Sequence, residues 1–276
     1  MQISKNESRR SPEPFLKWAG GKRWLSTSGH QIVPREYNRY IEPFLGGGSV
    51  FFSEMPEKGT LSDVNLELTE TYKAIRDDWQ IVQSILSQHQ TQHSKDYYYK
   101  IRNKIYKDRF EKAARFIYLN RTCWNGLYRV NLKGQFNVPI GTKSSVLLKT
   151  DKFDIISELL RNFVIENRDF AQSIKTSREN DFIFCDPPYT VKHNFNGFVK
   201  YNEKLFSWDD QIRLRDCLER AHERGTRITV TNADHESIRE IYKREIWNKK
   251  RMHRSSVISA SSNFRSETSE LLIKNW

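Results

Sequence analysis

The chain has 276 residues, of which 37% are hydrophobic and 29% are charged. This length suits one large α/β domain or one domain with an insertion. Lysine and arginine exceed aspartate and glutamate by 12, which favours a polyanionic partner such as nucleic acid, although a solvated basic surface gives the same total. No apolar run approaches the roughly 20 residues that cross a bilayer, and residues 1–10 lack the apolar core of a signal peptide. These features exclude a membrane-spanning or secreted protein and predict a cytoplasmic one.

The first motif in the chain is F-L-K-W-A-G-G-K at residues 15–22. A phosphate-binding P-loop would need glycine at position 16 and Ser or Thr at position 23, where this chain has Leu16 and Arg23, so we exclude that motif. The segment instead predicts a tight loop that lets the backbone approach a ligand, with Lys22 available to bind a carboxylate.

Residues 40–52 predict a short strand, a glycine turn and the start of a helix. Glycines in the turn allow close approach of a cofactor, and the helix N-terminus offers free N–H groups. Residues 60–63 then predict a second strand that ends in Asp63, and an acid in this place can bind the hydroxyls of a ribose. The order of strand, glycine turn, helix, strand and acid indicates a cofactor that contains a nucleoside.

Helical spacing of apolar residues predicts helices over residues 66–90 and 94–118. The second helix is strongly basic. His89 and His93 are four residues apart, but the first has no glutamate beside it as in a zinc-protease helix, so we expect a surface helix and no metal site. The three cysteines are widely spaced without a C-x-x-C pair and predict neither a disulfide framework nor structural zinc.

Residues 119–139 are rich in Asn, Arg and aromatic side chains, and the region of Gly134 predicts a hairpin turn. Arg, Asn and Gln side chains can bind base edges in a DNA groove, and an exposed Trp or Tyr can fill the gap that a displaced base leaves. A polar hairpin with an aromatic core is an equally good interpretation of this stretch.

Further strands are predicted at the four segments 163–170, 182–185, 227–232 and 271–274, with a helix over 208–224. A polar loop is predicted at 190–204. The segment 239–254 stands out only as a basic stretch.

The apolar strand at 182–185 runs into Asp186-Pro187-Pro188-Tyr189. Prolines donate no N–H, so the strand ends here and leaves the Asp186 carboxylate and the Pro187 carbonyl as converging acceptors. Two acceptors that hold the hydrogens of an aromatic –NH2 group would free its lone pair for attack, and the Tyr189 ring offers a face for a planar base. We predict a catalytic role for Asp186, Pro187 and Tyr189; the alternative is a structural turn after a strand.

Taken together, four motifs resemble the Dam-type (alpha group) DNA adenine-N6 methyltransferases. They are F-L-K-W-A-G-G-K, E-P-F-L-G-G-G-S-V-F at 42–51, the N-G-L-Y-R-V-N and Q-F-N-V-P run from 125, and D-P-P-Y at 186–189, in the family's order and across nearly the whole chain. The resemblance implies S-adenosyl-L-methionine as the methyl donor, double-stranded DNA as the partner and a flipped adenine as the acceptor.

The resemblance also assigns individual residues. It implies that the cofactor is bound by Trp18, Lys22, Phe44, Gly46, Gly48, Asp63, Asp169, Phe170 and Asp186. It implies that DNA is bound by Lys17, Arg121, Trp124, Asn125, Leu127, Arg129, Asn131, Pro139 and Arg265. Within this set Arg129 contacts a base, Trp124 enters the duplex beside the flipped base, and Arg121 and Asn131 hold phosphates.

Relatives with the N-G-L-x-R motif act on GATC, so the resemblance implies GATC or a related short site. They usually continue with Arg-Tyr where this chain has Thr142-Lys143, a departure that removes a phosphate clamp and relaxes selection at an outer base pair.

We therefore expect an α/β protein with a Rossmann-like methyltransferase sheet and an inserted, mainly helical target-recognition domain that carries a β-hairpin. The cofactor-binding catalytic domain is expected at 1–65 and 151–276, and the target-recognition domain at 66–150. A monomer is expected. The sequence leaves open two alternatives, an enzyme that acts alone and one that protects DNA against a cognate restriction endonuclease encoded elsewhere. Methylation of RNA adenine or of cytosine N4, and DNA binding without catalysis, are the rival hypotheses.

Overall fold

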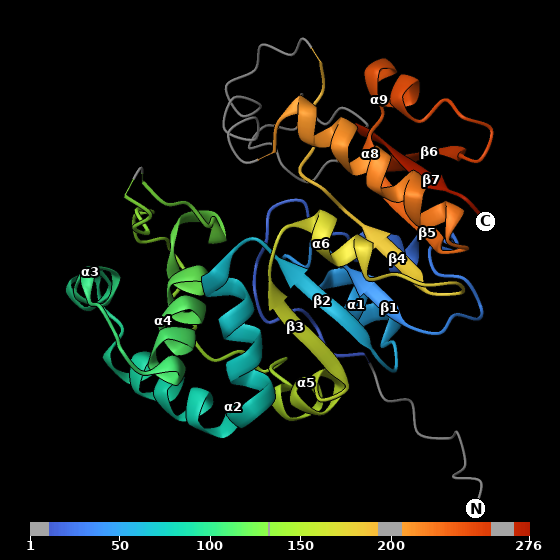
Figure 1. The fold of residues 1–276 in the computed structure, drawn as a ribbon. Helices are drawn as coiled ribbons and strands as arrows, with labels where there is room; N and C mark the ends of the chain where they lie inside the picture. Colours follow the sequence, from blue (N-terminus) through green and yellow to red (C-terminus); the bar gives the residue numbers. More distant parts are fainter. Residues whose placement is uncertain (1–10, 132, 193–205, 255–267) are drawn as a thin grey trace, which may run out of the picture. The chain divides into compact units, whose positions relative to one another are not determined.

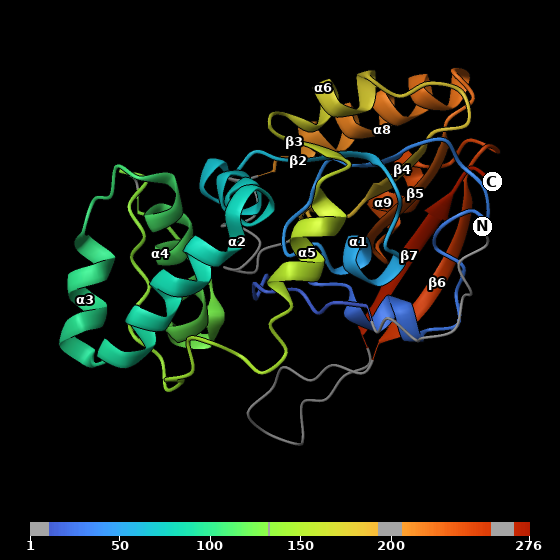
Figure 2. The same cartoon turned by 90° about the horizontal axis from the view of Figure 1, so that it is seen from below.

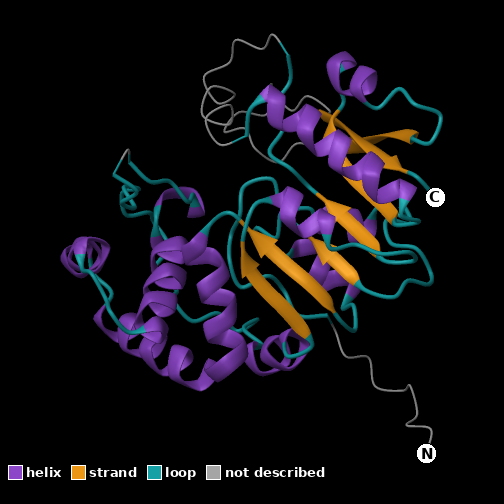
Figure 3. Cartoon of the chain, viewed as in Figure 1, coloured by secondary structure: helices purple, strands orange, loops and turns teal. Residues whose placement is uncertain are grey.

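The structure, a computed structural model, describes residues 11–131, 133–192, 206–254 and 268–276. The chain divides into two compact units, which are described separately. Unit 1 comprises Met1–His30, Gly46–Pro56 and Asn65–Phe163, and unit 2 comprises Gln31–Leu45, Glu57–Val64 and Val164–Trp276. Helices dominate unit 1 and the strands gather in unit 2 (Figure 3).

Unit 2 is built on a seven-stranded sheet with the strand order β3-β2-β1-β4-β5-β7-β6 (Figure 1). The strands are β1 (Tyr40–Glu42), β2 (Gly59–Asp63), β3 (Phe163–Asn167), β4 (Phe182–Cys185), β5 (Arg227–Ala233), β6 (Asn248–Arg254) and β7 (Thr268–Lys274). β1 pairs in parallel with β2 and β4, and β4 pairs in parallel with β5, whereas β7 is antiparallel to β5 and β6. This mostly parallel sheet confirms the predicted α/β class.

The central strands form because their apolar runs are buried on both faces, as in parallel sheets generally. All residues of β1 and β4 are buried. One face of the sheet carries α6 (Phe170–Lys175) and α8 (Trp208–Glu223), which lie side by side in Figure 2. Ile41 and Ile183 of the sheet and Leu218 of α8 are fully buried in one core cluster. Ser207 and Asp210 form a capping box that starts α8.

The edge of the sheet contains a strand that the sequence did not indicate. Residues 239–254, expected only to be basic, contain α9 (Glu236–Ile241) in part and β6, whose seven residues all pair with β7. Lys250, Arg251 and His253 of β6 are exposed while Met252 is buried. Basic side chains on an edge strand oppose pairing with other chains, which explains why this strand carries so little apolar character.

Unit 1 contains η1 (Arg23–Thr27), α1 (Ser49–Glu54), α2 (Leu66–Gln92), α3 (Lys95–Asn103), α4 (Arg109–Thr122), η2 (Trp124–Gly126) and α5 (Phe153–Leu160). The predicted helix over 94–118 is wrong at 104–108, where α3 ends and α4 begins. The Asp108 side chain accepts hydrogen bonds from the backbone N–H groups of Phe110 and Glu111, so it caps a new helix and breaks the expected one.

The hairpin turn predicted in the region of Gly134 is present. Val130 and Phe136 form an antiparallel bridge, and the Asn131 N–H donates to the carbonyl of Gln135 across the turn at Gly134. None of the helices within the described ranges is long and apolar enough to cross a membrane.

Candidate active site and DNA-binding residues

Asp186 directly follows β4 at the carboxyl edge of the sheet in unit 2. Thr231, on the neighbouring strand β5, donates its hydroxyl to Oδ1 of Asp186 at 2.6 Å. Because β4 and β5 pair up to Cys185 and Val230, the sheet itself sets this contact. The Asp186 residue is half-buried and the following Pro187 is buried. The carboxylate that begins the D-P-P-Y motif is therefore positioned by two neighbouring strands, β4 before it in the chain and β5 through Thr231.

Tyr189 is fixed by a second long-range contact within unit 2. Its hydroxyl donates to Oε2 of Glu270 on β7 at 2.8 Å, and Glu270 is only 6% exposed. Burial, followed by the negative charges of Asp186 and Glu270, raises the pKa of Tyr189 well above its usual value. The ring is therefore neutral and its orientation is set by the sheet, as a stacking surface for a base requires.

Glu42, at the end of β1, is a buried carboxyl group to which the sequence analysis assigned no role. It is 2% exposed, and its Oε2 accepts a hydrogen bond of 2.8 Å from the Tyr40 hydroxyl. Burial raises its pKa well above the usual value, and the charges of Asp186 and Asp63 add to this effect. The available signal was a carboxyl group at the end of a buried strand, directly before the glycine turn.

Three carboxyl groups thus end three adjacent parallel strands, β2, β1 and β4. Burial, and then the charges of Asp186 and Asp63, raise the pKa of Glu42 and favour its neutral form. The negative charges of Asp63 and Asp186 on either side of it favour a cationic ligand. Among the described residues, no group of three His, Cys, Asp or Glu side chains is arranged to hold a metal ion.

Phe44, Asp169 and Phe170, expected near the cofactor, meet in unit 2. Phe44 stacks on Phe170 with ring centroids 5.4 Å apart. Asp169 caps α6 through the Ala171 N–H at 2.9 Å and forms two hydrogen bonds with the Arg213 guanidinium. Arg213 lowers the pKa of Asp169 and also covers the Phe170 ring at 4.0 Å. Phe170 is only 2% exposed, so its ring belongs mainly to the core.

In unit 1, Trp18 lies between the glycine turn and the recognition hairpin. Gly46 has a φ of +48°, and a Cβ there would lie 2.7 Å from Cδ1 of Trp18, so only glycine permits this packing. On its other side Trp18 stacks on Tyr128 with centroids 5.5 Å apart. Gly48 is the N-cap of α1, and Lys22 is buried with its Nζ donating to the Gly20 carbonyl at 2.7 Å.

Asn120, which the sequence prediction also missed, holds Lys17 to the end of α4. The Lys17 N–H donates to Oδ1 of Asn120, and Nδ2 of Asn120 donates to the Lys17 carbonyl, both at 2.8 Å. Asn120 is 1% exposed. This reciprocal pair ties the first motif of the chain to the segment expected to bind DNA, through contacts that only the folded chain reveals.

Arg121, expected to hold a phosphate, is instead engaged inside unit 1. It is 4% exposed and binds both carboxylate oxygens of Asp151 at 2.6 and 2.7 Å. Its remaining donors reach the carbonyls of Phe15 and Val146. In this arrangement the guanidinium has a structural role, and the phosphate contact expected from the resemblance does not fit its geometry.

The remaining expected DNA-binding residues lie on or beside the hairpin of unit 1. Trp124 is 52% exposed and Leu127 is 41% exposed. Lys17, Asn125, Arg129 and Pro139 are also exposed. Trp124, Asn125 and Leu127 are therefore exposed apolar and polar side chains that are close together in the sequence. Side chains of both kinds can contact base edges in DNA.

Two residues of the hairpin, Arg129 and Asn131, form side-chain hydrogen bonds within the same segment. Nε of Arg129 donates to Oδ1 of Asn137 at 2.9 Å, which orients the guanidinium while leaving it exposed. Oδ1 of Asn131 accepts from the N–H groups of Lys133 and Gln135, so this side chain stabilises the turn. Arg265 lies outside the described residues.

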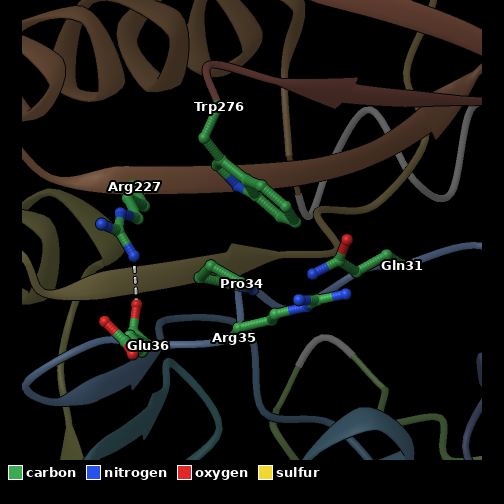
Figure 4. Close-up of a pocket in the computed structure, with 6 residues that line it drawn as sticks. All are labelled: Gln31, Pro34, Arg35, Glu36, Arg227 and Trp276. Atoms are coloured by element: carbon green, nitrogen blue, oxygen red, sulfur yellow. Dashed lines mark hydrogen bonds between the residues drawn. The ribbon is translucent and has the colours of Figure 1, made fainter.

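Unit 2 also has a hollow of about 510 Å³, lined by Gln31, Pro34, Arg35, Glu36, Arg227 and Trp276 (Figure 4). Arg227 begins β5 and donates to the Glu36 carbonyl. The hollow is therefore at the amino end of β5, whereas Asp186 follows the carboxyl end of β4, which runs parallel to it. It is not part of the candidate site.

Comparison with known proteins agrees with these motifs. Residues 18–256 match the family model of the D12 class N6 adenine-specific DNA methyltransferases. The chain is 35% identical over 272 residues to the Type II methyltransferase M1.LlaDCHI of Lactococcus lactis subsp. cremoris, covering 95% of each chain. It is 31% identical over 263 residues to the DNA adenine methylase of Escherichia coli strain K12, covering 94% of this chain and 93% of that one.

A protein of Escherichia phage P1 named DNA N-6-adenine-methyltransferase is 36% identical over 234 residues, which are 83% of this chain and 31% of the phage protein. The family model spans most of the chain and two relatives cover it almost completely. The chain belongs to the D12 class N6 adenine-specific DNA methyltransferase family.

Proposed function

We propose that this methyltransferase transfers a methyl group from S-adenosyl-L-methionine to N6 of a flipped adenine in duplex DNA, within GATC or a related short site. The observation that carries the proposal is Asp186 at the carboxyl end of β4, held by Thr231 and followed by the buried Pro187. A carboxylate and a carbonyl oriented in this way accept the two hydrogens of an aromatic amine.

The methyl donor fits the chemistry of the residues at the sheet edge. When bound, S-adenosyl-L-methionine supplies a methyl group activated by a positively charged sulfonium. The carboxylates of Asp63 and Asp186 lie at this edge, and their strands flank the strand that ends in the buried Glu42. Their negative charge favours a cationic ligand. Trp18, Lys22, Gly46 and Gly48 of unit 1 remain proposed cofactor residues, as do Phe44, Asp63, Asp169, Phe170 and Asp186 of unit 2.

The chain's own residues then act by positioning. Asp186 and the Pro187 carbonyl accept the N6 hydrogens, so the nitrogen lone pair is directed away from the ring. Tyr189, neutral and hydrogen-bonded to Glu270, provides the face against which the base is stacked. No covalent intermediate on the protein is needed.

The proposed recognition site uses the hairpin of unit 1. Arg129 is the proposed base-reading residue because its guanidinium is exposed and oriented by Asn137. Asn125, Leu127 and Lys17 are proposed to act beside it, Pro139 to contact the DNA, and the exposed Trp124 to fill the space that the flipped base leaves. The functional division proposed is 1–65 with 151–276 for catalysis and 66–150 for recognition, in a cytoplasmic monomer that acts either alone or beside a separately encoded restriction endonuclease.

Long-read mapping of methylated bases tests the proposal in one experiment. DNA from cells that express the chain should carry N6-methyladenine in a single short motif, and cells that express the Asp186→Ala variant should carry none. The unfolding temperature of the purified variant is the control for folding. Methylated cytosine, methylation confined to RNA, or full activity of Asp186→Ala would each contradict the assignment.

A further inference from the structure

Gln211, near the start of α8 in unit 2, is a buried polar residue that contacts the D-P-P-Y motif. It is 0% exposed. Its Nε2 donates to the Pro188 carbonyl at 3.2 Å, and its Oε1 accepts from Nδ2 of Asn232 at 3.0 Å. Asn232 is on β5 and is also 0% exposed. A side chain of α8 therefore joins the motif to the strand beside β4.

Backbone groups fix the direction of both amides. Oδ1 of Asn232 accepts from the Ala233 N–H at 2.8 Å. Since an N–H only donates, the amide oxygen of Asn232 faces it and the NH2 group faces Gln211. The NH2 group of Gln211 in turn faces the Pro188 carbonyl, which only accepts. Each hydrogen bond between Ala233 and Pro188 thus has its donor and acceptor in the required order.

Two further contacts fix the start of α8 relative to the motif. The capping box of Ser207 and Asp210 lies directly before Gln211, whose N–H donates to the Ser207 carbonyl at 3.2 Å. The hydroxyl of Thr190, which is 1% exposed, donates to the Phe206 carbonyl at 2.7 Å. The two residues that flank the tyrosine of the motif are thus both bound to the beginning of α8.

A single free rotation separates the Pro188 carbonyl from the Pro187 carbonyl. The Pro187 carbonyl lies in the planar peptide that ends at Pro188. The ring of Pro188 fixes its φ, so only its ψ can change the angle between the two carbonyl groups. The hydrogen bond from Gln211 to the Pro188 carbonyl restricts that rotation.

We propose that Gln211 is a positioning residue for methyl transfer, which sets the direction of the Pro187 carbonyl by holding the Pro188 carbonyl. This inference rests on the proposed function, in which the Pro187 carbonyl accepts a hydrogen of the adenine amine. Rates of transfer depend steeply on the alignment of the reacting groups, so a support behind an acceptor affects the rate more than it affects binding.

Two consecutive residues of β5 then orient the two proposed acceptors. Thr231 holds Asp186 directly, whereas Asn232 acts on the motif through Gln211. Consecutive side chains of a strand point to opposite faces of the sheet. The two supports therefore begin on opposite faces of the same strand.

The test is single-turnover methylation of a GATC duplex by the full chain. Gln211→Met keeps the length of the side chain and removes both amide hydrogen bonds. The rate constant should fall by roughly 10–100-fold, because the misplaced carbonyl no longer aligns the amine for attack. The Kd values for S-adenosyl-L-methionine and for the duplex should stay close to those of the unaltered chain, which a general loss of structure would not leave intact.

Asn275→Leu is the matched control. Oδ1 of Asn275 accepts from the Ile228 N–H at 2.7 Å, and its Nδ2 donates to the Thr226 carbonyl at 2.8 Å. It thus bridges two backbone groups as Gln211 bridges its partners, but at the amino end of β5, at the opposite end from Asn232. The control should be less stable to urea, as Gln211→Met is, and should methylate at the rate of the unaltered chain.

Asn232→Leu is a second variant, which leaves Gln211 in place and removes the group that orients its amide. The rate should fall by a smaller factor than in Gln211→Met. The double variant should be no slower than Gln211→Met alone, since both changes act on the same hydrogen bond. If Gln211→Met does not fold, Asn232→Leu decides the question.

An unchanged rate in either variant would overturn the role of Gln211. So would equal slowing by Asn275→Leu, or weakened binding of cofactor or duplex that accounts for the whole loss. Mass spectrometry of the product separates this result from the proposed function. If the unaltered chain forms no N6-methyladenine, the proposed function itself is wrong, whereas a rate defect limited to the variants leaves it standing.

Discussion

Thr231 donates its hydroxyl to Oδ1 of Asp186 at 2.6 Å, which makes a residue of β5 the partner of the carboxylate that follows β4. The two strands pair in parallel through four residues each. The orientation of the proposed amine acceptor is consequently built into the sheet rather than into the D-P-P-Y loop alone.

Replacing Thr231 by valine should lower the rate of methyl transfer while leaving substrate binding nearly unchanged. Valine has the shape of threonine without the hydroxyl, so Asp186 loses a hydrogen bond to a charged group, about 1.5–3 kcal/mol. We expect kcat to fall by roughly 10–100-fold with little change in KM for DNA. Single-turnover kinetics measure this, and Thr231→Ser should recover most of the rate. If the free energy of unfolding falls by as much as the activation free energy of methyl transfer rises, Thr231 has a structural role only.

Glu42→Gln should change the dependence of stability on pH. The unfolded chain ionises Glu42 near the usual pKa of 4.5, whereas burial raises the pKa of the folded protein. Above pH 4.5 the unfolded state therefore binds fewer protons, and the stability of the unaltered protein falls as pH rises until the raised pKa is passed. The variant avoids this loss.

The difference in unfolding free energy between Glu42→Gln and the unaltered protein should accordingly grow from pH 4.5 upward, by at most about 1.4 kcal/mol per pH unit. Urea unfolding at several pH values measures it. Glu57→Gln, at an exposed position of unit 2, is the control and should show no such trend. A constant difference across this range would contradict the burial argument.

Arg121→Ala should destabilise unit 1, because it leaves the buried carboxylate of Asp151 without its partner. Breaking a buried ion pair of this kind costs about 3–5 kcal/mol. Asp151→Ala should have an effect of similar size, and the two effects should not add in the double variant. If Arg121→Ala instead leaves stability intact and lowers the salt slope of DNA binding, Arg121 holds a phosphate as the resemblance implied.

Sequence patterns predicted the central strands of the sheet but not the structural role of Arg121. The strands β1, β2, β4 and β5 were predicted because each is a short, mostly apolar or β-branched run bounded by polar residues, glycine or proline. β6 was missed because most of its residues are basic and only Met252 is apolar and buried. The motif residues around Asp186 were likewise visible as a linear pattern.

The hydrogen-bond partners of the motif residues could not be predicted from the sequence. Thr231 is 45 residues from Asp186, Asn120 is 103 residues from Lys17, and Asp151 is 30 residues from Arg121. Each pairing depends on strand register or helix packing, which no local spacing encodes. Arg121 was assigned to a DNA phosphate from the family resemblance, and the sequence offered no sign that its partner is Asp151.

Arg129→Ala should lower the discrimination between the target site and a site altered at one base pair by about 1–3 kcal/mol. The guanidinium is exposed, and its Nε donates to Oδ1 of Asn137 at 2.9 Å. Asn137→Ala should thus shift discrimination in the same direction by a smaller amount. Competition between duplexes measures both, and a uniform loss across all sequences would make Arg129 a phosphate contact.

Asn120→Ala should weaken cofactor binding and DNA binding together. The Asn120 side chain accepts a hydrogen bond from the Lys17 N–H and donates one to the Lys17 carbonyl. The residue after Lys17, Trp18, contacts the Gly46 turn and Tyr128. Loss of the amide leaves the Lys17 backbone groups unpaired at a cost of about 1–3 kcal/mol. The Lys17–Trp18 segment then shifts, so both proposed binding functions that depend on it lose affinity.

Isothermal titration with S-adenosyl-L-methionine and anisotropy with a GATC duplex measure the two affinities. Asn125→Ala, at an exposed position of the same segment, should weaken DNA binding alone, and a DNA-only defect in Asn120→Ala would show that this amide does not couple the two.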